Sequence, residues 1–378
     1  MFAIFLLLAP LFVAVPVRER PREPVKSSSW VGKTIFMRAS GVRVDLSAEP
    51  NELNPNPPNS VPANAIQYRV FGERLNHVQI KTREGQSGWL RKTDVILLED
   101  AIPFFTKQIQ ANPSDSATYS RRASAYRSKG ELDLALKDAS EALRLNPHAA
   151  NYNNRALVWT AKKNYDQAIA DYAKAIELVP QYALAHVNRA SMWHAKKDND
   201  KAIADTSAAL QWEPKNPTAY RIRGISWLGK KEYDKAIEDL SRSLELDAKS
   251  SQTHVDRAEA HARKKQHVKA LDDFEAALRL EPTNGTAMAA FALWLASCPE
   301  VKFRDGKRAL ELALKAHQQN KSETRAIEAL AAACAELGRF EDAVKWAEHA
   351  LFDPALRDDT EARQRLEAYR KQKPYRAE

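Results

Sequence analysis

Prolines recur at a nearly constant interval through the middle of the chain, with successive spacings of 34, 33, 34, 34 and 34 residues. They stand at Pro113, Pro147, Pro180, Pro214 and Pro282, with Ala248 in the one place where a proline is missing. An alanine lies twelve residues before each of these positions, at Ala101, Ala135, Ala168, Ala202, Ala236 and Ala270. A period of this length is typical of helix–turn–helix repeats, which are stabilised by stacking on their neighbours.

The composition is that of a chain that buries a core. Of its 378 residues, 44 % are hydrophobic and 28 % charged, which disfavours wholesale disorder and a multispanning membrane protein. Glycine is scarce, with 11 residues, and this disfavours nucleotide-binding folds built on glycine loops. The net charge of +9 permits an anionic partner without requiring one.

Other positions of the repeat carry matched types of side chain. With Pro147 taken as position 32, position 4 holds Tyr119, Tyr152, His186, Tyr220 and His254, and position 11 holds Tyr126, Trp159, Trp193, Trp227 and His261. Position 8 holds Ala123, Ala156, Ala190, Gly224 and Ala258. Small side chains permit close crossing of helices, and rings fill the spaces between them. This pattern resembles tetratricopeptide repeats, which implies a mostly α fold, an α–α superhelical solenoid.

The pattern extends beyond these five units. A half-repeat over residues 100–113 precedes them, and a sixth and a seventh repeat follow around a five-residue insertion near Cys298. We expect the solenoid, a half-repeat plus about seven repeats, over residues 99–354. A capping helix and tail are expected over residues 355–378, because a terminal repeat needs a polar outer face.

Residues 30–98 have a different texture, with short alternating apolar segments between Gly, Pro and Asn. Five strands are expected, and residues 50–62 are expected to form a surface loop. The stretches Val70-Phe-Gly-Glu, Val78-Gln-Ile and Gly88-Trp-Leu-Arg resemble the second half of bacterial SH3-like domains. The resemblance implies a small all-β barrel that binds peptide or cell wall, or serves as a structural cap. Trp89 is expected in its core.

Residues 1–29 begin with an uncharged apolar run that ends at Val17, followed by Arg18, Arg20 and Arg22. The run is short for a membrane span and favours a secretory signal peptide, although no basic residue precedes it. Arginines after an uncleaved run would leave the body of the protein in the cytoplasm. We expect an exported or membrane-tethered protein of the cell envelope, with cytoplasmic-side anchoring and a misplaced start codon as the alternatives.

Position 7 is arginine and position 23 aspartate in the same five repeats. The pairs are Arg122 with Asp138, Arg155 with Asp171, Arg189 with Asp205, Arg223 with Asp239, and Arg257 with Asp273. Both charges are lost together in the sixth and seventh repeats. We predict a structural ladder of ion pairs between helices; arginines that face a ligand are the alternative.

The resemblance implies that a ligand lies along the concave face, which the first helix of each repeat lines. Carried over by position, the candidate peptide-binding residues are Asn153, Leu157, Val187, Ser191, His194, Arg221, Ile225, Leu228, Val255 and Glu259. The Lys and Asn clamp that binds a terminal carboxylate in this family is not reproduced. The mixed apolar and polar groove favours an extended or helical peptide.

Lysine pairs recur at the turn within four repeats, at Lys162, Lys163, Lys196, Lys197, Lys230, Lys231, Lys264 and Lys265. Stacking would align them into one basic edge. This edge is either a set of solvated helix ends or a contact for an anionic surface. Nucleic acid is disfavoured, because no basic motif interleaved with aromatics accompanies the lysines.

Enzyme chemistry is not visible in the sequence. The nine histidines show no metal-ligand spacing, and there is no phosphate-binding loop, nucleophile elbow or Cys-x-x-Cys. No cofactor is expected. Cys298 and Cys334 fall on first helices of neighbouring repeats, where two buried thiols or a disulfide are the alternatives.

These observations favour a non-enzymatic adaptor or scaffold that binds a peptide or protein segment along the concave face. The alternative is a structural protein of the cell envelope, in which the β domain attaches to wall polymer or membrane while the repeats space other components. Partner identity and oligomeric state cannot be derived from a repeat surface, because the fold does not select the ligand.

Overall fold

The computed structural model describes residues 29–39, 43–45, 60–62, 67–74, 76–81, 86–354, 356–357 and 359–376. The predicted signal or anchor segment lies outside these residues. None of the helices in the part that is described is both long and apolar enough to cross a membrane.

Residues before the helical array form a small β domain. Its strands are β1 (Thr34–Met37), β2 (Arg43–Asp45), β3 (Ser60–Pro62), β4 (Gln67–Arg69), β5 (Gly72–Arg74), β6 (His77–Lys81), β7 (Ser87–Arg91) and β8 (Val95–Leu97). They make two antiparallel sheets, in the orders β4-β1-β8 and β3-β2-β7-β6-β5. Ile35, Val44 and Ile80 are fully buried between them, and Trp89 is buried as expected.

Three of these strands were not among the five predicted from the sequence. Residues 60–62 were assigned to a loop, but β3 pairs with β2 there, and β5 and β8 are also additional. Each is three residues long, which is too short to show an alternation of period two.

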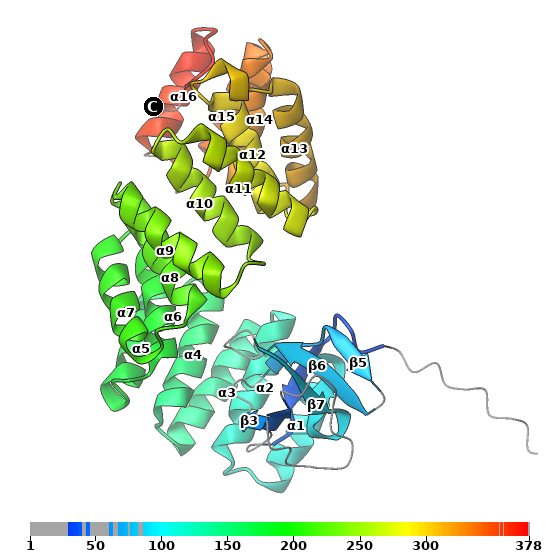
Figure 1. Cartoon of the computed structure of the whole chain (residues 1–378). Helices are drawn as coiled ribbons and strands as arrows, with labels where there is room; N and C mark the ends of the chain where they lie inside the picture. The colour runs from blue at the N-terminus through cyan, green and yellow to red at the C-terminus, as the bar shows by residue number, and fades with distance from the viewer. Residues whose placement is uncertain are drawn as a thin grey trace, which may run out of the picture.

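Sixteen α-helices follow in the described part of the chain (Figure 1). They are α1 (Leu98–Ala111), α2 (Ser116–Lys129), α3 (Leu132–Leu145), α4 (Ala149–Ala161), α5 (Tyr165–Leu178), α6 (Ala183–Ala195), α7 (Asn199–Trp212), α8 (Pro217–Gly229), α9 (Tyr233–Leu246), α10 (Ser251–Arg263), α11 (His267–Leu280), α12 (Gly285–Ser297), α13 (Gly306–Gln319), α14 (Thr324–Glu336), α15 (Phe340–Ala350) and α16 (Thr360–Arg370). Helices α2 to α15 are seven antiparallel pairs, and α1 is the predicted half-repeat.

Local capping fixes where many of these helices begin. The side chains of Asn164, Asp198, Asn216 and Asn284 accept hydrogen bonds from backbone N–H groups in the first turns of α5, α7, α8 and α12. These donors have no partner inside the helix, so the caps are stabilising, and they define the turns between helices.

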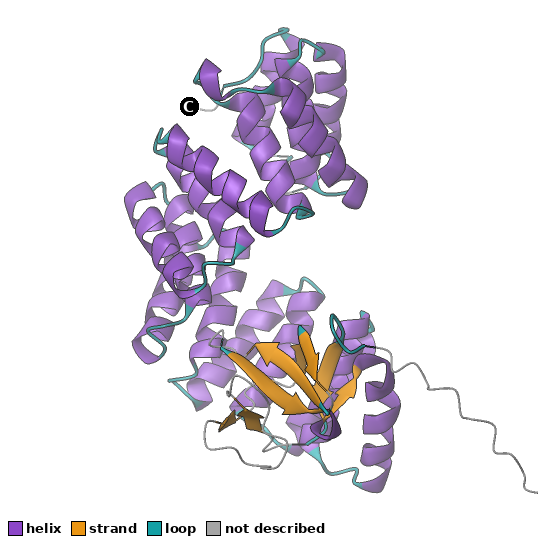
Figure 2. Ribbon diagram, turned by 45° about the vertical axis from the view of Figure 1, so that its right-hand side comes forward, coloured by secondary structure: helices purple, strands orange, loops and turns teal. Residues whose placement is uncertain are grey.

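The β domain covers the first end of the array (Figure 2). Phe36 and Ile96 from the strands pack with Ala101 and Phe105 of α1 in one buried cluster. The side-chain oxygen of Gln67 accepts a hydrogen bond of 2.9 Å from Ser128 of α2. The strands and the first helices are therefore one continuous packed unit.

The sixth and seventh repeats depart from the regular pattern. Nearly every residue of α12 is buried, and α12 packs closely along α14, with alanines on both helices. Leu366 and Tyr369 of α16 pack against the last pair, as expected of a capping helix. However, α16 also lies beside α10, where Arg263 contacts Glu361 across 98 residues of chain (Figure 1). The curvature of the array therefore brings α16 within reach of α10 at the C-terminal end.

Candidate functional site

The C-terminal half of the array forms a partly open cavity with a volume of about 720 Å³. Its wall comes chiefly from α8, α10 and α12, and α14 and α16 supply charged side chains. Apolar lining residues are Ile225, Leu228, Ala262, Leu293 and Trp294. A cavity of mixed apolar and charged lining between repeats has the size and chemistry of a ligand site.

Half of the predicted concave-face residues meet in this cavity. Those that line it are His194, Arg221, Ile225, Leu228 and Glu259. They come from three consecutive first helices, α6, α8 and α10, so position within the repeat places them on one side of the array.

The other five predicted residues lie elsewhere. Asn153, Val187 and Val255 are at most 4 % exposed and pack between helices, so the prediction that they face a ligand is corrected. Asn153 accepts a hydrogen bond from Asn188 of the next first helix, at 3.0 Å. Leu157 and Ser191 are half-buried outside the cavity lining. Neighbouring helices therefore cover the side chains of Asn153, Val187 and Val255.

Charged side chains cross the cavity between helices that are distant in sequence. Arg325 of α14 contacts Glu259 of α10 at 2.5 Å, and Arg263 contacts Glu361 at 3.2 Å. Arg365 of α16 contacts Glu361 at 3.1 Å and also pairs with Glu328 of α14. We call the pairs Glu259–Arg325, Arg263–Glu361 and Arg365–Glu328 the ionic clasp. It joins α10, α14 and α16 across the concave side.

Two buried ring nitrogens at this cavity lack a hydrogen-bond partner among the described residues, His194 Nδ1 and Trp294 Nε1. Burial lowers the pKa of His194 below its ordinary value and favours the neutral ring. Burial also raises the pKa of Glu259, although Arg325 opposes that shift. Unpaired buried polar atoms are costly, so these two are places where a bound group would be stabilised.

Sequence reasoning missed several members of the cavity. Asp256 accepts hydrogen bonds from Arg221 at 2.9 Å and from Gln252 at 2.8 Å. Arg325 and Arg365 come from the part of the chain after the insertion, where the repeat pattern loosens. Their place at the cavity depends on the curvature of the array, for which no local sequence signal exists. No three His, Cys, Asp or Glu residues are grouped as metal ligands in the part of the chain described.

The five predicted arginine–aspartate pairs are all brought together. In each, Nε and Nη2 donate to the two carboxylate oxygens at 2.6–2.8 Å, and the aspartates are 6–8 % exposed. Such bidentate, charge-assisted bonds fix the second helix of each repeat against the first. The five arginines are therefore engaged in ion pairs within the fold.

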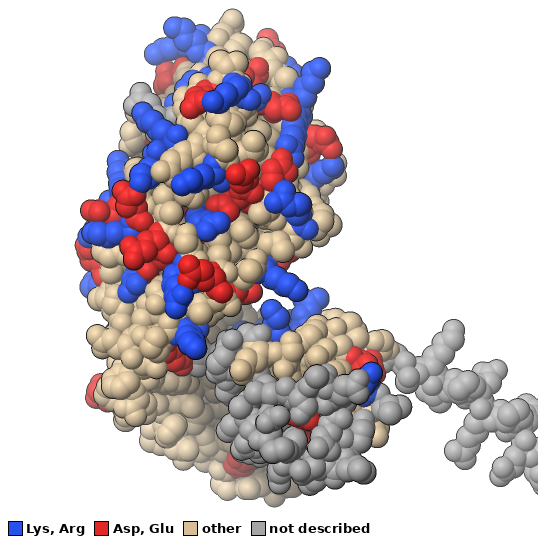
Figure 3. Space-filling view, viewed as in Figure 1, with Lys and Arg blue, Asp and Glu red and all other residues tan. Residues whose placement is uncertain are grey.

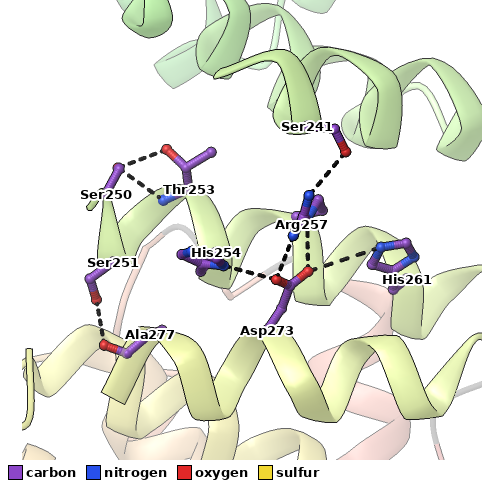
Figure 4. Close-up of polar contacts among 9 residues, drawn as sticks. All are labelled: Ser241, Ser250, Ser251, Thr253, His254, Arg257, His261, Asp273 and Ala277. Atoms are coloured by element: carbon purple, nitrogen blue, oxygen red, sulfur yellow. Dashed lines mark hydrogen bonds and ion pairs between the residues drawn. The ribbon is translucent and has the colours of Figure 1, made fainter. Parts of the chain in front are cut away.

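The ladder has further contacts that the sequence pattern did not predict. Figure 4 shows Asp273 between Arg257, His254 and His261, with His254 Nδ1 at 2.8 Å from the carboxylate. His186 contacts Asp205 in the same way at 3.1 Å. Arg257 also donates to Ser241 of the preceding repeat at 3.1 Å, so the ladder connects repeats as well as helices within a repeat.

The two lysines of each pair have different environments in the structure. The first lysine forms an ion pair with an aspartate of the preceding repeat: Lys162 with Asp133, Lys196 with Asp166, Lys230 with Asp200 and Lys264 with Asp234. The second lysines, Lys163, Lys197, Lys231 and Lys265, are exposed and have a left-handed backbone, with φ from 58° to 62°. Figure 3 shows acidic and basic side chains interspersed over the upper helices. The predicted basic edge is therefore partly neutralised.

A family model of the tetratricopeptide repeat matches four overlapping stretches of the chain, residues 120–183, 161–217, 198–252 and 233–285. A tetratricopeptide repeat protein from Parabacteroides merdae is similar in fold, with 16 % identity and a TM-score of 0.54 over 68 % of this chain and 98 % of that chain.

One chain of the APC/C hetero-tetramer Cut9–Hcn1 is similar with 17 % identity and a TM-score of 0.54, over 62 % of this chain and 46 % of that chain. Yeast Tom70 is similar with 19 % identity and a TM-score of 0.50, over 73 % and 59 %. At these identities the likeness shows the fold alone. Residues 120–285 consist of tetratricopeptide repeats, and the helical array that contains them is a tetratricopeptide-repeat solenoid.

Proposed function

We propose that this protein is a non-enzymatic scaffold that binds a peptide or protein segment in the concave cavity between α8, α10 and α12. The observation that carries the proposal is the convergence of His194, Arg221, Ile225, Leu228 and Glu259 on one cavity. Apolar side chains with a charged rim suit a peptide that buries one or two apolar anchors and pairs its polar groups at the edge. The Cut9–Hcn1 structure, similar in fold, is itself a hetero-tetramer.

A matched pair of substitutions tests the site. Ile225 and Leu157 occupy the same position of the repeat, but only Ile225 lines the cavity. Peptides would be selected from a random display library against the full chain. Their affinities would then be compared for the wild type, Ile225→Glu and Leu157→Glu. We expect Ile225→Glu to weaken binding at least tenfold, about 1.4 kcal/mol, and Leu157→Glu to leave it unchanged.

Thermal unfolding of both variants is the control, because each side chain is half-buried. Equal loss of affinity in two equally stable variants would overturn the cavity as the binding site. Failure of the selection to yield any peptide whose binding saturates would overturn peptide binding itself.

We further propose that the β domain is SH3-like and that the protein is exported or tethered in the cell envelope. The two small antiparallel sheets and the apolar N-terminal run support this. Fractionation of cells that express the full chain, with and without residues 1–29, tests the localisation. Equal distribution of both forms in the cytoplasm would contradict it.

A further inference from the structure

Cys298 and His267 lie at the wall of the cavity, and Glu300 lies on the Nε2 side of His267. The Cys298 Sγ lies 3.7 Å from His267 Nδ1, and His267 Nε2 lies 3.7 Å from a carboxylate oxygen of Glu300. His267 is the first residue of α11, and Cys298 is the residue that ends α12. A thiol, an imidazole and a carboxylate in this order are the arrangement in which a base activates a sulfur nucleophile.

The thiol and its imidazole neighbour are buried at the edge of the cavity. Cys298 is 1 % exposed and His267 is 5 % exposed, and both line the cavity. A small molecule in the cavity lies beside these two residues, and it reaches the sulfur where the side chains that cover the thiol move aside.

The second half of the site is the indole of Trp294. Its ring packs beside His267, with centroids 6.3 Å apart, and Trp294 lies one helical turn before Cys298. Trp294 is 8 % exposed and lines the cavity, and its Nε1–H donates to none of the described residues. An unsatisfied buried donor next to a thiol is suited to a ligand with a carbonyl oxygen.

The position of His267 allows transfer of the thiol proton to its ring, and charged side chains lie on both sides of the pair. His267 stands at the N-terminus of α11 with Nδ1 toward the Cys298 sulfur, so this nitrogen is the one placed to accept the thiol proton. Glu300 would then stabilise the imidazolium. Arg304 and Arg376 donate to the carbonyls of Cys298 and Ala296 and place positive charge near the sulfur. Burial raises the pKa of the Cys298 thiol, so the resting sulfur holds its proton and depends on His267 to lose it.

We propose that Cys298 is a covalent binding site for small α,β-unsaturated carbonyl compounds. The thiol proton passes to His267 as sulfur attacks the β-carbon, so that the S–C bond forms and the alkene π bond breaks. The proton then moves from His267 to the α-carbon, while the Trp294 N–H binds the carbonyl oxygen on which negative charge develops. The addition has no leaving group and needs no co-reactant. The addition requires no bound peptide, although the thiol and the proposed peptide site share one cavity.

Cys334 is an internal control for this site. It is also buried, at 2 % exposed, and burial raises its thiol pKa as well, but it does not line the cavity. The folded full chain would be treated with N-ethylmaleimide, and the labelling of each cysteine followed by peptide mass spectrometry. We expect Cys298 to react at least about tenfold faster than Cys334.

Two variants separate the chemistry from packing. His267→Gln keeps a hydrogen-bonding side chain but no base, and is expected to slow Cys298 labelling about 100-fold with no change at Cys334. Trp294→Phe keeps the ring, and is expected to slow labelling by N-ethylmaleimide but not by methyl methanethiosulfonate, which has no carbonyl. Equal rates at the two cysteines, labelling that appears only as the protein unfolds, or an unchanged Cys298 rate in His267→Gln would overturn the proposal.

Discussion

Arg263 of α10 and Glu361 of α16 lie 3.2 Å apart, although 98 residues separate them in sequence. With Glu259–Arg325 and Arg365–Glu328, this pair closes the ionic clasp across the concave side. The curvature of the C-terminal half is therefore held by charged side chains as well as by apolar packing.

The best-buried pair of the clasp is expected to matter most for stability. Arg365 and Glu328 have side chains 11 % and 13 % exposed, so Arg365→Met leaves a nearly buried carboxylate without its partner. We expect a loss of about 3 kcal/mol in unfolding free energy, and recovery of most of it in Arg365→Met with Glu328→Leu. Urea unfolding measures both.

Arg263→Met is the matched control, because Arg263 and Glu361 are 43 % and 33 % exposed. It should cost less than about 1 kcal/mol, as exposed ion pairs do. Equal losses for Arg365→Met and Arg263→Met would show that burial does not govern the clasp.

The ladder offers a comparison between a plain pair and one with a histidine. Arg155→Met should cost about 3 kcal/mol, and the double change with Asp171→Leu should recover most of it. The double change Arg189→Met with Asp205→Leu should recover less, because His186 loses its partner too. Additive losses in the Arg155 cycle, measured by urea unfolding, would contradict pairing as the source of the effect.

The stability that Asp205 supplies is expected to depend on pH. Burial raises its pKa, but hydrogen bonds from Arg189 and His186 outweigh burial, so the pKa of Asp205 lies below its ordinary value of 3.8. A lowered folded-state pKa gives stability that is present above the unfolded pKa and is lost as the pH falls through the folded pKa. Wild type should therefore exceed Asp205→Asn in melting temperature at pH 7, and the gap should narrow below about pH 4. A gap that stays constant from pH 7 to pH 3 would refute this.

Four lysines occupy a backbone conformation that suits glycine. Gly130 and Gly338 hold the corresponding place in other repeats, with φ of 81° and 75°. A residue with a Cβ is destabilised by about 1 kcal/mol or more in the left-handed region. Glycine has no such steric cost, but it loses more backbone entropy on folding, and this second cost is somewhat smaller. Lys163→Gly and its three equivalents should each stabilise the fold by about 0.5 kcal/mol. The reverse change Gly130→Lys should lower the melting temperature.

Gly224 is expected to resist replacement by alanine. A Cβ there would lie 2.7 Å from Leu240 Cγ, and this overlap costs about 1–3 kcal/mol. The gain of about 1 kcal/mol from helix propensity is smaller, so Gly224→Ala should destabilise. Because Leu240 is the obstacle, Gly224→Ala combined with Leu240→Ala should lose less than the sum of the single changes. Stabilisation by Gly224→Ala alone would show that Leu240 moves aside freely.

The repeat and its ladder could be predicted because the same evidence occurs five times. A single Arg and Asp sixteen residues apart, such as Arg155 and Asp171, do not indicate an ion pair. The presence of both residues in five repeats and the loss of both in two others do indicate one. The burial of Asn153, Val187 and Val255 was not predictable. The position of a residue in the repeat indicates which face of the helix carries its side chain, but not how far neighbouring helices cover that side chain.

The cavity and its thiol could not be predicted for a different reason. Cys298 and His267 meet once in the chain, 31 residues apart, and no second copy of the pair exists to compare. The position of α16 relative to α10 results from small rotations between several irregular repeats. A prediction that misjudges any one of these rotations would place α16 away from α10.

The array is covered at both ends, by Phe36 and Ile96 of the β domain against α1 and by Leu366 and Tyr369 of α16 against the last pair. An uncovered repeat end would offer an apolar face onto which another molecule could stack head to tail, and such contacts propagate into filaments. With both faces occupied, this route to polymerisation is closed. We therefore expect a partner to contact the sides of the array rather than its ends.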